Sequence, residues 1–175
     1  KELSFDRACR LGCIACASGG GGCQFLGTAG TSQVVAEGLG FCLPHAALSP
    51  SGEPIWYDMA KKSAVAAMDL YKAGITTKDI ITDKAIENAM VIHAAFGGST
   101  NLLLHLPAIA FMAGCHVPTV HDWARVNKEV PRLVSVLPMG PINYPTVDVF
   151  MAGGVPEVML HLRKMGLLHE DVMTV

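Results

Sequence analysis

The sequence predicts a helix-rich fold that includes one or two β-strands. Apolar residues recur at helical spacing through most of the chain and are bounded by glycine and proline signals. Only one short run rich in β-branched residues, at 133–137, is typical of a strand. Of the 175 residues, 51% are hydrophobic and 16% are charged. This content supplies a core and indicates apolar surface that something else normally covers.

The N-terminal segment, residues 1–23, is rich in cysteine and glycine and ends in four glycines followed by Cys23. Four consecutive glycines hold no regular element, but they let the backbone approach a bulky object closely. Four of the six cysteines lie in this segment. That clustering favours metal chemistry in a reducing cytosol over a disulfide framework.

Helical periodicity with start or stop signals predicts helices at about 28–38, 56–73, 83–96, 100–113 and 155–165. Thr31 or Ser32 is available as the N-cap of the first helix. The prolines of residues 41–54 predict a loop. The fourth helix follows a Gly-Gly break, with Ser99 or Thr100 as its cap. It is apolar nearly all round, so we expect it to be buried.

Charge and hydropathy argue against two classes of protein, those that bind nucleic acid and those that span a membrane. The net charge is −2, and no basic stripe alternates with aromatic residues, which argues against nucleic acid as a partner. The most apolar run, 102–115, is interrupted by Pro107 and Gly114 and is too short to span a bilayer. The chain opens without an initiator Met or a signal-peptide pattern. Both ends look cut, so we expect an internal piece of a cytoplasmic protein.

Cys9, Cys13 and Cys16 have the Cys-x3-Cys-x2-Cys spacing. This resembles the motif of radical S-adenosylmethionine enzymes, in which three thiolates hold an iron–sulfur cluster. That family usually has an aromatic residue before the third cysteine, where this chain has Ala15. Its motif also follows a barrel strand, whereas helices follow here. We interpret these thiols as packing or incidental residues and keep the radical-enzyme alternative open.

Three blocks of sequence together resemble the dihydroxy-acid and phosphogluconate dehydratase family. Residues 23–32 read Cys-Gln-Phe-Leu-Gly-Thr-Ala-Gly-Thr-Ser, residues 96–101 read Phe-Gly-Gly-Ser-Thr-Asn, and residues 152–159 read Ala-Gly-Gly-Val-Pro-Glu-Val-Met. The blocks stand in the family's order and at its approximate spacing, so the resemblance extends over nearly the whole chain. Within the family, residues 20–33 and 130–138 most resemble the bacterial xylonate (sugar-acid) dehydratase branch. One departure is Gly30, where the family usually has Asn.

The resemblance implies that residues 1–175 are a partial N-terminal α/β domain, truncated at both ends, with the C-terminal β-barrel domain absent. It implies a hydro-lyase that converts a sugar acid such as D-xylonate to a 2-keto-3-deoxy acid. Its cofactors would be an iron–sulfur cluster, of the 2Fe-2S or 4Fe-4S type, and Mg²⁺. An open iron would act as Lewis acid for the leaving hydroxyl, and Mg²⁺ would bind the carboxylate.

Cys23 matches the last of the family's three cluster ligands. The resemblance puts the other two, the Mg²⁺ ligands and the catalytic serine outside residues 1–175. We therefore expect no catalytic residue in this chain and no activity from it alone.

The candidate substrate-binding residues are polar side chains in the matched blocks and one loop histidine: Thr28, His45, Ser99, Thr100 and Asn101. At the Gly-Gly break, helix N-terminal amides are suited to bind the substrate carboxylate or the cluster. The alternative is that Ser99, Thr100 and Asn101 only cap the helix. His93 and His105 lie on apolar helical faces, which favours hydrogen-bonded core histidines.

Two rival functions remain open at this point. One is a non-catalytic helical interaction module whose apolar surface binds a partner chain. The other is a dihydroxy-acid dehydratase of branched-chain amino-acid synthesis. For the dehydratase, the expected partners are a small-molecule sugar acid, the missing remainder of the same chain and, at full length, further copies in a homo-oligomer.

Overall fold

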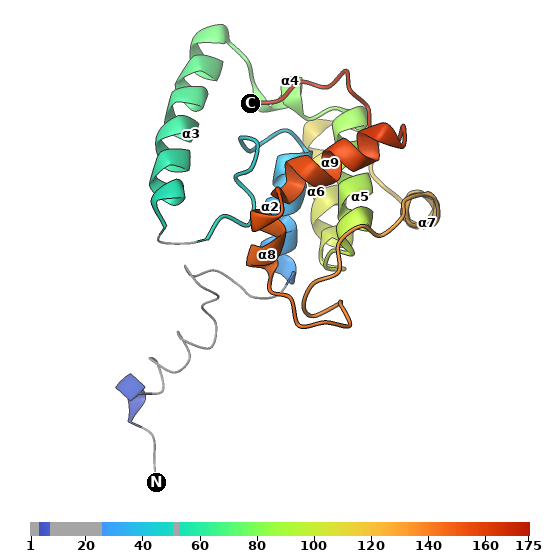
Figure 1. The fold of residues 1–175 in the computed structure, drawn as a ribbon. Coiled ribbons are helices and arrows are strands. Elements are labelled where there is room, and N and C mark those ends of the chain that lie inside the picture. Colours follow the sequence, from blue (N-terminus) through green and yellow to red (C-terminus); the bar gives the residue numbers. More distant parts are fainter. Residues whose placement is uncertain (1–3, 8–25, 51–52) are drawn as a thin grey trace.

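The computed structural model describes residues 4–7, 26–50 and 53–175. Their helices, drawn in Figure 1, are α2 (Thr28–Gly38), α3 (Pro54–Ala73), α4 (Thr77–Ile80), α5 (Asp83–Phe96), α6 (Leu102–Ala113), α7 (Val120–Glu129), α8 (Thr146–Met151) and α9 (Gly154–Lys164). The predictions for Cys9, Cys13, Cys16, Cys23 and the glycines at 19–22 fall outside the described residues.

Helix α5 is the centre of the core. Eleven of its 14 residues are buried, and α2, α6, α7 and α9 all contact it (Figure 1). Helix α2 crosses α5 at Gly38, where an added Cβ would lie 2.6 Å from Ile92 Cδ1. The missing side chain therefore lets the two helices approach closely.

The helices expected from periodicity are confirmed with small shifts at their ends. The helix predicted at 83–96 matches α5 at both ends, because Thr82 caps it by accepting from the Ala85 N–H and Gly97 ends it at φ 62°. The N-cap predicted for the first helix was wrong. Helix α2 starts at Thr28 with Gly27 as its N-cap.

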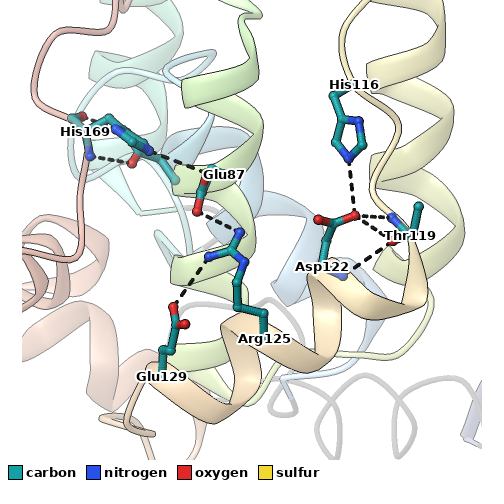
Figure 2. A network of polar contacts seen from close by, with 8 residues as sticks. Glu87, His116, Thr119, Asp122, Arg125, Glu129 and His169 are labelled. Atoms are coloured by element: carbon teal, nitrogen blue, oxygen red, sulfur yellow. Dashed lines mark hydrogen bonds and ion pairs between the residues drawn. The ribbon is translucent and has the colours of Figure 1, made fainter.

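Helices α4, α7 and α8 were not predicted. Helix α7 starts with a capping box, in which the Thr119 hydroxyl accepts from the Asp122 N–H and the Asp122 carboxylate accepts from the Thr119 N–H. The His116 ring also contacts this carboxylate (Figure 2). The Thr119 hydroxyl, the Thr119 N–H and His116 all hydrogen-bond to this carboxylate and hold the pKa of Asp122 well below its usual range.

The strand predicted at 133–137 is not formed among the described residues. The segment is extended and alternates in burial, with Val134 and Val136 inward and Leu133 and Ser135 outward. However, the Leu133 and Val134 N–H groups both donate to the Ala95 carbonyl at the end of α5, at 2.8 and 3.1 Å. No neighbouring strand in the described ranges offers a ladder. The helix-rich part of the fold prediction is confirmed.

The expectation that the apolar helix at 100–113 is buried was wrong. Helix α6 buries only Leu102, Leu106 and Ala110, while Leu104, Phe111 and Met112 are 74%, 70% and 77% exposed. One stripe packs on the core, and the described parts of the chain leave the other face uncovered. Helix α3 stands at the side of the bundle with no buried residue (Figure 1). Of the helices described, none is both long and apolar enough to cross a bilayer.

Polar contacts attach the C-terminal segment to α5. The Asn88 amide is buried, donates to the His169 carbonyl and accepts the His169 N–H, both at 2.9 Å. Figure 2 shows His169 beside Glu87, which is bonded to Arg125 of α7 at 2.9 Å. Arg125 also reaches Glu129. The paired bonds of Asn88 are the strongest of these restraints, because they are shielded from water whereas the ion pairs are exposed.

Replacing Gly38 by Ala should lower the free energy of unfolding by about 1–3 kcal/mol, the usual cost of over-packing a filled core. The new Cβ would lie 2.6 Å from Cδ1 and 3.4 Å from Cβ of Ile92, and Ile92 is fully buried. Chemical unfolding of the purified full-length variants measures the change.

Gly27→Ala is the control for a methyl group added without a clash, because a Cβ there meets nothing within 4 Å, and it should lose only the smaller cost of an alanine at the N-cap of α2. Ile92→Val removes the Cδ1 atom that clashes. The Gly38→Ala/Ile92→Val double variant should therefore lose less stability than the sum of the two single variants. Strict additivity, or a Gly38→Ala variant as stable as the wild type, would show that the two helices do not cross as described.

Candidate functional site

The 97–101 loop between α5 and α6 is hydrogen-bonded to the first turn of α2. The Ser99 N–H donates to the Thr31 hydroxyl at 2.9 Å, and the Ser99 and Thr28 hydroxyl oxygens are 3.5 Å apart. The Asn101 side-chain amide donates to the Thr28 hydroxyl. Three of the five candidate substrate residues, Thr28, Ser99 and Asn101, therefore form one polar cluster.

Gly98 allows this close approach. A Cβ at Gly98 would lie 2.6 Å from Thr31 Cγ2 and 2.7 Å from His93 Cδ2. Neither neighbour is free to give way, because Thr31 and His93 are both buried. The second glycine of the Gly-Gly break is thus required by packing of the loop between α2 and α5.

The capping interpretation of the loop holds only in part. The N-cap of α6 is Asn101, not Ser99 or Thr100, and its side chain makes no cap bond. The Ser99 hydroxyl accepts the Asn101 N–H at 3.3 Å, while the Asn101 amide is directed to Thr28. Thr100 is exposed, and its carbonyl accepts the Leu103 N–H.

His93 lies under the loop and His105 does not lie in the core. The His93 ring is buried, and its Nε2 is 2.9 Å from the Ser99 carbonyl oxygen. Burial lowers the pKa of His93, so the ring is neutral near pH 7. The prediction of a core histidine is confirmed for His93 and wrong for His105, which is exposed on the uncovered face of α6.

His45 contacts a different group of residues from the other candidates. Its backbone has φ 67°, in the left-handed region, and its ring meets Phe150 edge-on with centroids 4.2 Å apart. The His45 N–H donates to Glu37 Oε1 at 2.6 Å. A non-glycine residue held at this φ is costly and must be fixed by its surroundings. The Glu37 bond supplies that restraint.

Glu37 is a buried carboxylate that sequence reasoning missed. Its Oε2 accepts the Ala47 N–H at 2.9 Å, so its two oxygens fold the loop after α2 back along the helix. Burial raises the pKa of Glu37 above its ordinary value of 4.5, and the backbone hydrogen bonds offset part of the rise. The available signal was that Glu37 is the only charged residue in α2.

The described residues do not by themselves hold an iron–sulfur cluster. Cys42 and Cys115 are free thiols on separate segments, and the Cys115 thiol donates to the Ile81 carbonyl. Burial raises the pKa of both thiols, which disfavours the thiolate that binds iron. Within 4–7, 26–50 and 53–175 no three His, Cys, Asp or Glu side chains are grouped as metal ligands. The cluster prediction therefore depends on Cys23, outside the described residues and five positions before Thr28.

Comparison with known proteins identifies the family. The family model described as "Dihydroxy-acid/6-phosphogluconate dehydratase N-terminal" matches residues 3–175, and the chain belongs to this family. Two D-xylonate dehydratases of Escherichia coli, YjhG and YagF, are 74% and 70% identical to it over 99% of the chain. A dihydroxy-acid dehydratase of Leifsonia xyli subsp. xyli is 45% identical over 99% of the chain. The chain spans 27% of the length of each D-xylonate dehydratase and 30% of the third relative.

Replacing Glu37 by Gln should lower the free energy of unfolding by about 1–3 kcal/mol at neutral pH. The amide keeps one acceptor oxygen, so the N–H of either His45 or Ala47 loses its partner. The folded state raises the Glu37 pKa, so the folded protein binds a proton at Glu37 more tightly than the unfolded chain does. This tighter binding stabilises the fold fully below pH 4.5, and the contribution is lost as pH rises through the raised pKa. The advantage of wild type over variant should therefore be larger at about pH 5 than at about pH 7.

Chemical unfolding at both pH values measures this difference. Glu53→Gln is the control, because Glu53 is exposed and its side chain makes no cap bond. The control should be as stable as the wild type at each pH. An unchanged wild-type advantage between the two pH values would contradict a raised pKa at Glu37.

Proposed function

We propose that the full-length protein is a hydro-lyase that dehydrates a sugar acid such as D-xylonate to a 2-keto-3-deoxy acid. The observation that carries the proposal is 74% identity with a D-xylonate dehydratase across 99% of this chain. The hydrogen bonds between the first turn of α2 and the 97–101 loop support it. They bring two blocks of family sequence, far apart along the chain, into one polar cluster.

In this proposal Cys23 is a ligand of an iron–sulfur cluster and the candidate side chains bind the sugar acid. When bound, the cluster supplies a Lewis-acidic iron for the leaving hydroxyl, and Mg²⁺ held by residues outside this chain neutralises the carboxylate. This chain contributes hydroxyl and amide groups that suit a polyhydroxylated substrate: Thr28, Ser99, Thr100 and Asn101, with His45 from the loop after α2.

We propose further that residues 1–175 are part of an N-terminal α/β domain and that a C-terminal β-barrel domain lies elsewhere in the protein. In the whole domain, residues 133–137 pair with a strand outside this chain, since their side chains already alternate in burial. The exposed apolar faces of α3 and α6 are covered by the remaining chain or by further copies in a homo-oligomer. Free Cys42 and Cys115 support a cytoplasmic location.

Replacing Cys23 by Ser in the full-length enzyme should remove the cluster's visible absorption and abolish dehydration together. The reason is that a cluster with three protein thiolates is lost when one ligand is removed. Anaerobic reconstitution followed by absorption spectroscopy and a keto-acid assay measures both effects. Cys42→Ser and Cys115→Ser are matched controls, because both thiols lie outside any group of metal ligands among the described residues.

Cys13→Ser and Cys16→Ser should also leave absorption and activity largely intact. If these two variants lose the cluster while Cys23→Ser keeps it, the radical-enzyme interpretation is correct and the dehydratase assignment of Cys23 is wrong.

The proposed substrate preference is tested by comparing the enzyme's kcat/KM for two acids. The full-length enzyme should have a kcat/KM for D-xylonate about 100-fold or more above that for a branched 2,3-dihydroxy acid. The reason is that a site lined by hydroxyl and amide groups is left with unpaired polar atoms by the branched acid. A reversed preference, measured by the same keto-acid assay, would favour the dihydroxy-acid dehydratase of branched-chain amino-acid synthesis instead.

A further inference from the structure

His93 lies one turn before the 97–101 loop, at the C-terminal end of α5. Its side chain is 5% exposed, and its Nε2 is 2.9 Å from the Ser99 carbonyl oxygen. A carbonyl oxygen only accepts hydrogen bonds, so Nε2 must carry the proton and donate it. The neutral ring therefore has a lone pair on Nδ1.

A second unpartnered buried nitrogen belongs to Trp123, whose ring packs against His93. In the described part of the chain, His93 Nδ1 and Trp123 Nε1 are the buried side-chain nitrogens without a hydrogen-bond partner. The two rings meet edge-on, with centroids 5.1 Å apart, and Trp123 is also 5% exposed. Their requirements are complementary, because the indole N–H only donates and Nδ1 needs a donor.

Ser99 connects His93 to the candidate substrate residues. Its carbonyl accepts from His93, its N–H donates to Thr31, and its hydroxyl lies beside Thr28. The backbone of Gly98 rests directly on the imidazole, since a Cβ there would be 2.7 Å from His93 Cδ2. The imidazole ring therefore limits how closely the 97–101 loop can approach α5.

We propose that His93 is a positioning residue of the dehydratase site: by donating from Nε2 to the Ser99 carbonyl, with its ring packed edge-on against Trp123, it holds Ser99 and Asn101 against Thr28. This rests on the proposed function, in which those three side chains bind the sugar acid. His93 is buried beneath the loop and acts only through Ser99.

The test uses two amide variants of the full-length, cluster-loaded enzyme. The amide nitrogen of His93→Gln reaches about as far as Nε2 and keeps the donor for the Ser99 carbonyl. His93→Asn buries the same amide one methylene short of it. Three measurements are made on each variant: steady-state kinetics with D-xylonate, hydrogen–deuterium exchange of the peptide containing the Ser99 N–H, and the thermal midpoint.

His93→Asn should lose about tenfold in kcat/KM, the effect expected from one positioning hydrogen bond. It should also exchange the Ser99 N–H faster, with the cluster absorption unchanged. His93→Gln should stay within about threefold of the wild type in kcat/KM and keep its protection. Equal losses in both variants, or no loss in either, overturn the proposal.

If His93→Asn does not fold, the Gln variant decides alone. Retained kcat/KM and protection support the proposal, and loss of either at an unchanged thermal midpoint overturns it. If the wild-type enzyme does not act on D-xylonate, the proposed function fails. The exchange difference between Gln and Asn still tests whether His93 holds the loop.

Discussion

The close crossing of α2 and α5 is the constraint on which the rest of the described structure depends. At one end Gly38 lets α2 lie directly against the buried Ile92. At the other end Thr31 accepts the Ser99 N–H from the loop that follows α5. Because α2 is fixed at both ends, Thr28 is held where it meets Ser99 and Asn101. Cys23, the proposed cluster ligand, lies five residues earlier in the chain.

Much of the helical framework could be predicted because its signals are local. Thr82 and Gly97 delimit α5 through a hydroxyl cap and a left-handed glycine, both of which are readable from sequence. The grouping of Thr28, Ser99 and Asn101 could be suspected only from resemblance to a family. Nothing in composition or periodicity joins residues that are 71 positions apart.

The sequence predictions that failed concern features that depend on residues distant in the sequence or outside the described residues. The strand expected at 133–137 needs a neighbour that the described residues do not contain, and its N–H groups turn instead to the Ala95 carbonyl. The sequence predicts a buried helix at α6 because periodicity reports the apolar content of a helix and not which partner covers it. The partner of His93 and the role of Glu37 could not be predicted, because the function of a buried polar side chain depends on the partner it meets. That partner is a carbonyl at Ser99 in one case and the N–H groups of a returning loop in the other.

An anaerobic crystal structure of the full-length protein, with cluster and D-xylonate bound, tests the central claim most directly. That claim is the proposal that Cys23 binds the cluster and that the polar side chains brought together by the α2–α5 crossing bind the sugar acid. The predicted result is an iron–sulfur bond from Cys23, with sugar-acid oxygens within hydrogen-bonding distance of Thr28, Ser99 or Asn101. A cluster held by Cys13 and Cys16, or a sugar acid bound away from the 97–101 loop, would contradict the account.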